Sequence, residues 1–517
     1  MKTLVLCSLL IFGINLGFTQ TWEQKVKLEA TDQDSDDNLA IAVAKSGDYM
    51  IAGAWHEDHD GTGGEPLSNA GSAYIYRYNS GTDEWTQEAK LVAADREIDD
   101  WFGISVDISG TYAVVGAVQE NANRGAAYVY ERDGGGTWVQ VAKLEAPVRK
   151  ANDRFGNSVS ISDETIIVGA FHEDEDENEG ANMQNAGSAY IYTRSGGSWS
   201  FFQKIVASDR DTNDYFGYSV AVWDDNIIVG AYHRDIPTLS EYGGAYAFAY
   251  NGVEYEQTRI LEGADPYLGD RFGWSVDVYE NYYIVGAPYH DYDDAGTDPK
   301  NNAGAAYIFD ANNSWAQDKV VGGDRTAQDN VGEDVAIHGD RAIAGAPLQD
   351  YGLNGDPPYW GNGGAIFVYE VDGSGFWNQT QKLLTADRFT SDKFGHSVDL
   401  DSSSIVGGAP EDNNGSLPST GALYLFEDGV LGVNDVTSAT GMVAYPNPTQ
   451  GALQIDLGSN YTAGSIELFN MLGQKLLSSE FSNTRHVDLD LDIPTGIYLI
   501  NIETSNDVRG TIRISKR

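Results

Sequence analysis

The sequence predicts an all-β protein: a seven-bladed β-propeller with four-stranded blades, followed by a small C-terminal β-sandwich. A string of the form Asp-x-Phe-Gly-x-Ser-Val recurs along the chain, and a Gly-Ala pair follows it at a fixed distance. Each unit also contains four short segments of alternating apolar residues, separated by Gly, Asp and Asn turns. Such units bury their faces only against neighbouring units, so seven of them are expected to close into a ring.

The recurring string marks the first strand of each blade. Its seven copies, two of them degenerate, begin at Asp37, Asp100, Asp153, Asp214, Asp270, Asp329 and Asp392. The glycines of the string are Gly103, Gly156, Gly217, Gly273, Gly332 and Gly395. The Gly-Ala pair opens 13 residues after that position, at Gly53, Gly116, Gly169, Gly230, Gly286, Gly345 and Gly408. Inner strands crowd at the axis of a ring, and glycine permits close backbone approach and positive φ there. The Asp of each string is expected to accept hydrogen bonds from turn amides.

The order of segments predicts how the ring closes. Each unit continues with a Gly-x-Ala-Tyr-like third segment and an aromatic-led fourth segment. The first aromatic-led segment, at Trp22, precedes any Phe-Gly strand, whereas the last unit stops after Phe426. The N-terminal strand is therefore expected to complete the seventh blade, which removes exposed sheet edges. The propeller is predicted to span residues 21–427.

The Phe-Gly and Gly-Ala-Pro pairs, the latter complete at Pro288, Pro347 and Pro410, resemble the FG-GAP repeats of integrin alpha subunits and of many bacterial surface proteins. The resemblance covers residues 21 to about 427 and implies a propeller fold. It says little about function, because propellers serve both binding proteins and enzymes. The family's calcium loop between the first two strands is not expected here, because those turns are short, as at Ser109 and His338.

Composition and the N-terminal segment indicate an exported protein. The 517 residues include 78 acidic and 32 basic side chains, a formal charge of −46, which argues against nucleic acid or anionic membrane as a partner. Residues 1–20 read as a secretory signal peptide, with Lys2 before an apolar stretch and Gly17 and Thr19 before the expected cleavage site. The single cysteine, Cys7, lies inside it, so no disulfide is expected. No later apolar run reaches the roughly 20 residues of a transmembrane helix.

A linker is predicted at 428–441 and a second domain at 442–517, built from short β segments with Pro and Gly turns. The domain contains a Tyr-Pro-Asn-Pro opening, a Leu-Phe-Asn-Met-Leu-Gly-Gln centre and a Pro-Thr-Gly-Ile-Tyr hairpin. The residues of these motifs singled out are Tyr445, Pro446, Asn447, Pro448, Gly473 and Gly496. The motifs resemble the C-terminal sorting domain of the type IX secretion system of Bacteroidetes. This resemblance implies handling by that machinery and a protein that is either released or attached to the outer cell surface. An ordinary adhesive β domain is the alternative.

Acidic loops after the Gly-Ala pairs suggest a cation site. Alternating side chains there supply hard oxygen atoms of the kind that Ca²⁺ prefers. The candidate ligands are Asp58, Asp60, Asp174, Asp176, Asn178, Asp291 and Asp293. The alternative is a solvated acidic loop whose Asp residues cap turns, and zinc is a weaker possibility in a chain without other Cys.

Aromatic and histidine side chains in the same loops are candidates for a ligand-binding face, because flat rings stack on sugars. They are Trp55, His56, His172, His233, His290 and Trp360. Packing at the blade rim is the alternative. A further Asp precedes the Phe position by seven residues in six units, where it forms either a ligand cluster or a self-satisfied turn. These six are Asp32, Asp95, Asp209, Asp265, Asp324 and Asp387.

No catalytic motif is present: there is no GxSxG elbow, phosphate loop or HExxH sequence. The sequence therefore favours a secreted or cell-surface binding or adhesion protein that recognises an extracellular protein or glycan, with Ca²⁺ as a candidate cofactor. One alternative is a polysaccharide-degrading lyase or hydrolase, for which the loop around Tyr359 and Trp360 is the best candidate site. Another is a structural component of a surface matrix.

Overall fold

The computed structural model describes residues 21–60, 64, 66–180, 182–236, 239–293, 295–353, 359–429, 443–445, 452–470, 475–491, 493, 496–504 and 509–516. The proposed signal peptide at 1–20 lies outside these ranges. The chain divides into two compact units, one of residues 22–427 and one that contains residues 428–517. Among the described residues, no helix is long and apolar enough to cross a membrane.

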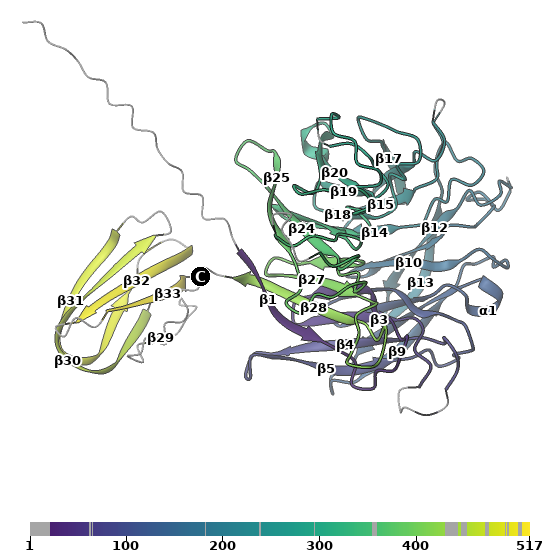
Figure 1. Cartoon of the computed structure of the whole chain (residues 1–517). Coiled ribbons are helices and arrows are strands. Elements are labelled where there is room, and N and C mark those ends of the chain that lie inside the picture. The colour runs from purple at the N-terminus through teal and green to yellow at the C-terminus, as the bar shows by residue number, and fades with distance from the viewer. Residues whose placement is uncertain are drawn as a thin grey trace, which may run out of the picture. The chain divides into compact units, whose positions relative to one another are not determined.

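The first unit is a ring of seven four-stranded antiparallel sheets (Figure 1), which confirms the predicted propeller. The first three blades are β2 (Leu39–Ser46), β3 (Tyr49–Ala54), β4 (Ser72–Asn79) and β5 (Glu84–Leu91); β6 (Phe102–Ser109), β7 (Tyr112–Ala117), β8 (Ala126–Arg132) and β9 (Trp138–Leu144); and β10 (Phe155–Ser162), β11 (Thr165–Ala170), β12 (Ser188–Ser195) and β13 (Ser198–Ile205). The next three are β14 (Val220–Trp223), β15 (Asn226–Ala231), β16 (Gly244–Tyr250) and β17 (Tyr255–Leu261); β18 (Val276–Tyr279), β19 (Tyr282–Ala287), β20 (Ala305–Asp310) and β21 (Ala316–Val320); and β22 (Val335–His338), β23 (Arg341–Ala346), β24 (Ala365–Val371) and β25 (Trp377–Leu383). Two short helical segments, α1 (Glu120–Asn123) and η1 (Ala311–Asn313), lie in loops.

The seventh blade closes the ring with the N-terminal strand. It consists of β26 (Val398–Leu400), β27 (Ser404–Ala409), β28 (Ala422–Gly429) and, outermost, β1 (Thr21–Leu28), in the order β1-β28-β27-β26. Figure 1 shows β1 beside β28, although the two are about 400 residues apart in sequence. Isolated parallel bridges join each blade to the next, and the bridge between Leu39 and Gly421 joins the seventh to the first. This closure was predicted from the order of the repeat segments.

The glycine of the Gly-Ala pair in one blade faces the Phe-Gly glycine of the next blade. A Cβ atom on Gly345 would lie 1.9 Å from the carbonyl oxygen of Gly395, and a Cβ on Gly53 would lie 1.8 Å from that of Gly103. Real Cβ atoms do not approach backbone this closely, so no larger residue fits without moving a strand. The repeated glycines therefore set the spacing of the inner strands, as the sequence predicted.

Apolar side chains pack between neighbouring blades. In the five strings that contain Phe, this residue is buried against aromatic rings of the third strand in its own blade; the Phe102 centroid lies 5.5 Å from Tyr128 and 6.2 Å from Tyr130. The same arrangement recurs for Phe155 with Tyr190 at 5.5 Å. The core is thus a set of layers between blades, and no blade has an independent core.

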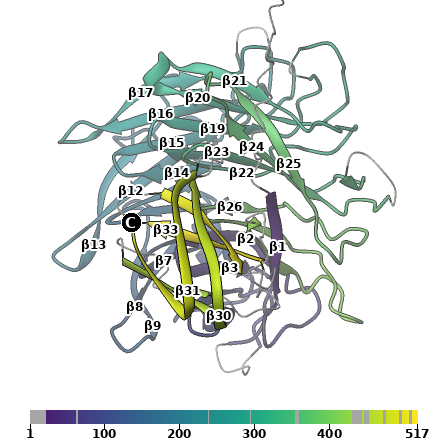
Figure 2. The same cartoon turned by 90° about the vertical axis from the view of Figure 1, so that its left-hand side faces the viewer.

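The C-terminal unit contains β29 (Val443–Tyr445), β30 (Ala452–Asn470), β31 (Lys475–Asp490), β32 (Gly496–Thr504) and β33 (Arg509–Lys516). The predicted sandwich is not confirmed, because these strands join into one five-stranded antiparallel sheet. The 19-residue β30 pairs with β31 (Figure 2), and also with β29 near its start and β32 near its end. Of the motif residues, Tyr445 ends β29 and Gly496 begins β32. Pro446, Asn447, Pro448 and Gly473 lie outside the described residues.

Candidate functional site

The predicted metal ligands at the start of the acidic loops close those loops. The Oδ1 atoms of Asp58, Asp174 and Asp291 accept backbone amide hydrogen bonds of 2.7–2.8 Å. Each donor lies eleven residues further on, at Asn69, Asn185 and Asn302. An arginine from the inter-blade loop that follows, such as Arg96, also donates to the carbonyl of each Asp. These three carboxylates therefore act as turn acceptors.

The second set of predicted ligands also forms turns. Oδ1 of Asp60, Asp176 and Asp293 accepts the amide of the residue four positions later, at 2.9, 2.8 and 2.6 Å. The Asn178 amide donates to Asp176 Oδ1 at 2.9 Å. Over the described ranges, the acidic or histidine side chains that converge within 4.8 Å as a possible metal site are Glu173, Glu175 and Glu179. None of the predicted aspartates belongs to that group.

A buried polar position that the sequence analysis missed lies four residues after each Gly-Ala glycine. It is occupied by Glu57, Glu120, Glu173, Arg234, His290, Gln349 and Asp412, all of which are buried. The signal was present in the sequence, because polar residues hold one fixed repeat position in all seven units.

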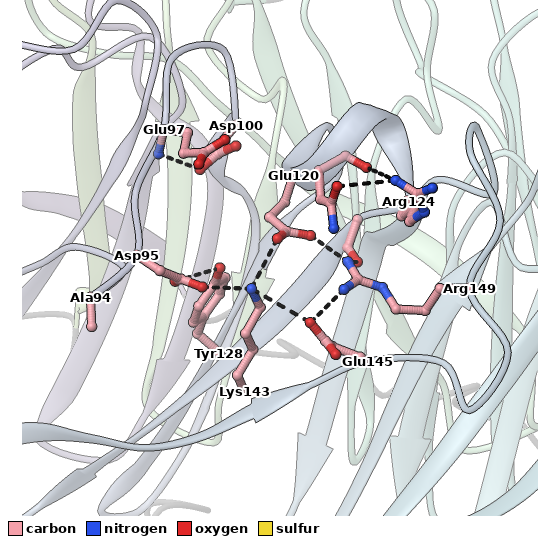
Figure 3. A network of polar contacts seen from close by, with 12 residues as sticks. Ala94, Asp95, Glu97, Asp100, Glu120, Arg124, Tyr128, Lys143, Glu145 and Arg149 are labelled. Carbon is pink, nitrogen blue, oxygen red and sulfur yellow. Dashed lines mark hydrogen bonds and ion pairs between the residues drawn. The ribbon is translucent and has the colours of Figure 1, made fainter.

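In the second blade this position organises a network of ion pairs (Figure 3). Lys143 Nζ lies 2.9 Å from Glu120 Oε1 and 2.6 Å from Asp95 Oδ2. The Tyr128 hydroxyl donates to Asp95 Oδ1 at 3.0 Å, and Arg149 pairs with both Glu120 and Glu145. Tyr, Asp, Lys and the buried acid therefore satisfy one another. For the Asp that precedes each Phe by seven residues, the sequence left open a ligand cluster or a turn; in this blade it joins an ion-pair network.

The first and fourth blades form a similar network of ion pairs with partly different residues. In the first blade, Lys90 Nζ lies 2.8 Å from Asp32 and 3.1 Å from Glu57. In the fourth blade Ile260 takes the register position of that lysine opposite Tyr246, and the buried position changes from an acid to Arg234. Arg234 then pairs with Asp209 at 2.8 Å and Glu262 at 2.7 Å. The cation thus comes from the fourth strand in the first blade and from the loop in the fourth blade, but it pairs with the inter-blade Asp in both. This indicates that the network has a structural role.

His290 is a correction to the predicted ligand face. Pro288 occupies the place of the aromatic residue of other units, such as Phe171, so the aromatic-His pair falls one position later; His290 therefore takes the buried position and is 0% exposed. Its Nδ1 lies 3.1 Å from Asp270 Oδ2 and its Nε2 lies 3.3 Å from Lys319 Nζ. Burial lowers the pKa of His290, but ion pairs with Asp265 and Asp270 outweigh it and raise the pKa overall. His290 belongs to the network of the fifth blade.

The Asp of each recurring string is buried and accepts the amide of the residue three positions earlier, as predicted. The seven donors are the amides of Asp34, Glu97, Lys150, Asp211, Tyr267, Thr326 and Phe389. Burial raises the pKa of Asp214 and Asp37 to about 7, and that of Asp100 and Asp153 to about 6. These carboxyl groups are costly to ionise because the amide replaces only part of their hydration.

An axial channel of about 540 Å³ runs between the inner strands. The residue after each Phe-Gly pair, the variable position of the string, lines it in every blade. These residues are Ile41, Ile104, Asn157, Tyr218, Trp274, Glu333 and His396. The Ser and Val positions that follow, such as Ser105 and Val106, also line the channel but change little from blade to blade. Side-chain chemistry is thus free to vary around one shared cavity.

Aromatic rings gather beside this channel. Trp55, which also lines it, stacks on His56 at 4.0 Å and meets Trp101 edge-on at 4.5 Å. Trp274 lies 5.0 Å from both Tyr218 and Tyr232.

Two further predicted histidines lie among aromatic or acidic neighbours. The rings of His172 and Tyr215 are 5.3 Å apart, and His233 Nε2 lies 3.4 Å from Glu241 Oε1. Burial lowers the pKa of His172, as it does for His56. Trp360 is not among the channel residues and instead packs on Phe389 at 5.3 Å.

The residues that precede the Phe of the string have left-handed backbone conformations. Trp101, Tyr215 and Arg271 have φ of 57°, 58° and 56°. Such conformations are unfavourable for bulky residues and persist where packing requires them. The Arg271 guanidinium is held over Tyr289, 4.3 Å from the ring centroid.

Four aspartates also line the channel. Asp107, Asp277, Asp334 and Asp399 each accept the amide of the next residue and an amide from the following blade; for Asp107 the second donor is Ile161 at 2.7 Å. These hydrogen bonds link the inner strands of adjacent blades, which belong to separate sheets. Burial raises the pKa of Asp107 to about 6 and that of Asp277 to about 7.

Glu333 and His396 are the ionisable residues at the variable position. Burial raises the pKa of Glu333 to about 7, and Glu333 accepts a hydrogen bond from Trp274. Burial lowers the pKa of His396 to about 4, so its imidazole is neutral at pH 7. One side of the channel therefore combines aromatic faces with polar groups.

Comparison with known proteins supports the repeat reading. The FG-GAP repeat family matches residues 22–76, 85–130, 138–192, 199–248, 255–309 and 377–426, together more than half of the chain. The family described as Secretion system C-terminal sorting domain matches residues 443–515. No protein in the curated comparison matches the chain.

Solved structures give only distant similarities. Sqt1 from Saccharomyces cerevisiae is 9% identical, with 96% of this chain and 99% of Sqt1 covered and a TM-score of 0.39. Two candidate 6-phosphogluconolactonases, from Bacteroides uniformis and Bacteroides fragilis, are 10% and 7% identical, with TM-scores of 0.38 and 0.40. The alignments cover 67% and 68% of this chain and 85% and 86% of those proteins. At such scores they carry no argument about function.

The family matches, the seven blades and the matched tail agree with one another. The chain belongs to the FG-GAP repeat family, and its C-terminal sorting domain marks it for type IX secretion to the cell surface or the extracellular space.

Proposed function

We propose that this protein is a secreted or surface-attached binding protein that holds a glycan at the axial channel. The observation that carries the proposal is that the residue after the Phe-Gly position lines one cavity in every blade and differs in chemistry from blade to blade. Aromatic, amide and ionisable side chains at one repeat position, all facing one cavity, are suited to bind a specific ligand.

The chemistry of the lining supports a sugar as ligand. The indoles of Trp55 and Trp274 offer flat faces for sugar rings, and Asn157 and Glu333 offer hydrogen-bonding groups for hydroxyls. The formal charge of −46 and the channel aspartates disfavour acidic polysaccharides. A neutral or basic glycan fits this lining.

The test is binding of the full secreted chain to a glycan array, followed by calorimetry with the strongest neutral or basic hit. We expect Trp274→Ala and Glu333→Gln each to weaken binding at least tenfold. Trp360→Ala is the matched control, because it removes an indole outside the channel and should leave affinity unchanged. Retained affinity in both channel variants would refute the proposal, as would binding only to an extracellular protein with no glycan bound.

A further inference from the structure

The third blade departs from the network that its neighbours share. In six blades an Asp stands seven residues before the Phe position, but in the third blade that residue is Val148, which is 41% exposed. Lys204, the lysine of this blade, therefore lacks its usual loop carboxylate. Its Nζ lies 3.5 Å from Glu173 Oε1 and 2.9 Å from Glu179 Oε1, which comes from the long loop after β11.

The same loop brings in a third acid. Carboxylate oxygens of Glu173, Glu175 and Glu179 all lie within 4.8 Å of one another. Glu173 is 1% exposed and Glu175 is 5% exposed. Their charges are opposed by Lys204 and by Lys150, whose side chain is 48% exposed where it pairs with Glu175. Three carboxylates against two ammonium groups leave one negative charge over.

One oxygen in this cluster has no donor. The side chain of Glu175 is 7% exposed; its Oε1 is held by Lys150 and by Asn182 Nδ2 at 3.1 Å, but its Oε2 is buried without a hydrogen-bond partner. The Tyr190 hydroxyl donates to Glu173 Oε2 at 2.5 Å, so the oxygen without a hydrogen-bond donor is Oε2 of Glu175. Two buried carboxyl groups this close need a proton or a cation between them.

We propose that Glu173, Glu175 and Glu179 bind a hard divalent cation, of which Ca²⁺ is the best match. All three ligands are carboxylates, which hard cations prefer over nitrogen or sulfur ligands. Ca²⁺ tolerates the irregular geometry of a loop-borne site better than Mg²⁺, which demands a near-ideal octahedron. The site differs from the aspartates predicted from the sequence, since Asp174 and Asp176 accept turn amides, whereas Glu173, Glu175 and Glu179 of the same loop converge.

The test is calorimetric titration of the EDTA-treated full chain with CaCl₂, and separately with MgCl₂. We expect one saturable Ca²⁺ site per chain and weaker Mg²⁺ binding. Glu175→Gln and Glu179→Gln should each lower Ca²⁺ affinity at least tenfold. Glu177→Gln is the matched control, because it removes the same charge from an exposed position in the same loop and should leave affinity unchanged.

Two results would overturn the proposal. One is the absence of saturable Ca²⁺ binding to the unmodified chain. The other is equal affinity in the Glu175, Glu179 and Glu177 variants, which would mean diffuse attraction to an acidic surface. Because Glu175 is buried and its variant could unfold, the partly exposed Glu179 supplies a second variant, and circular dichroism of each checks that the propeller is intact.

Discussion

Replacing the buried carboxyl of Asp214 by an amide is expected to stabilise the propeller at alkaline pH. Asp214 is 2% exposed, its Oδ2 accepts the Asp211 amide at 2.6 Å, and burial raises its pKa to about 7. An asparagine oxygen can accept the same hydrogen bond without carrying a charge. The Asp214→Asn substitution therefore removes the cost of ionisation and keeps the contact.

The sign and size follow from the difference between the folded and unfolded states. An unfolded aspartate has a pKa of about 3.9, so the folded state binds the proton more tightly and loses stability as the pH rises from about 4 through 7. At about 1.36 kcal/mol for each of roughly three pH units, the loss reaches an upper limit of about 4 kcal/mol at pH 8. Below pH 4 both states are protonated and the wild type keeps its full stability.

The assay is urea unfolding of wild type and Asp214→Asn at pH 5, 6, 7 and 8. We expect the wild type to lose stability over this range, the variant to lose less, and the variant to be the more stable protein at pH 8. Asp225→Asn, an exposed aspartate in the adjacent hairpin turn, is the control and should follow the wild type. A variant that is less stable than wild type at pH 8, or that has the same pH dependence, would show that Asp214 is stabilised as a carboxylate and would refute the reasoning.

Three other changes test the scaffold and its export. Gly345→Ala places a methyl group 1.9 Å from the Gly395 carbonyl oxygen, so we expect a loss of more than about 3 kcal/mol by thermal unfolding; a loss under 1 kcal/mol would show that the inner strands separate easily. Lys90→Met leaves Glu57 buried without its cation and should cost about 3–5 kcal/mol, whereas the exposed Lys25→Met should cost about 1 kcal/mol or less; equal losses would contradict the structural role of the network. Deletion of residues 443–515 should leave the propeller folded but retained in the cell, measured by immunoblots of cell and medium fractions, and normal export of the truncated chain would rule out the sorting role.

Much of the fold could be predicted because the residues that shape each blade recur at fixed positions of the repeat. The paired glycines, the buried Phe and the capping Asp recur at fixed spacing, and each has a local physical reason that needs no knowledge of the partner. The position of Trp22 ahead of the first Phe-Gly strand was enough to predict closure by β1. The tail was harder, because alternating strands in a short domain fit both a sandwich and the single sheet around the long β30.

The site was predicted only in part, because spacing along a loop does not say which way a side chain points. Asp174 and Glu175 are neighbours in sequence, yet one closes a turn and the other is buried beside Glu173. Because Pro288 takes the place of the aromatic residue of other units, His290 stands one position later than the other loop histidines and lies in a buried network instead of on the expected ligand face.

The sequence by itself determined the number of blades, the closure of the ring and the route of secretion. Each of these depends on a repeat or motif that can be recognised from neighbouring residues in the chain. The tertiary structure alone decided that the residue after the Phe-Gly position lines one channel, since that requires seven strands, spread along the chain from Ile41 to His396, to meet at one axis. It also decided which acids converge, because convergence depends on the path of a folded loop and on the loss of a single aspartate at Val148.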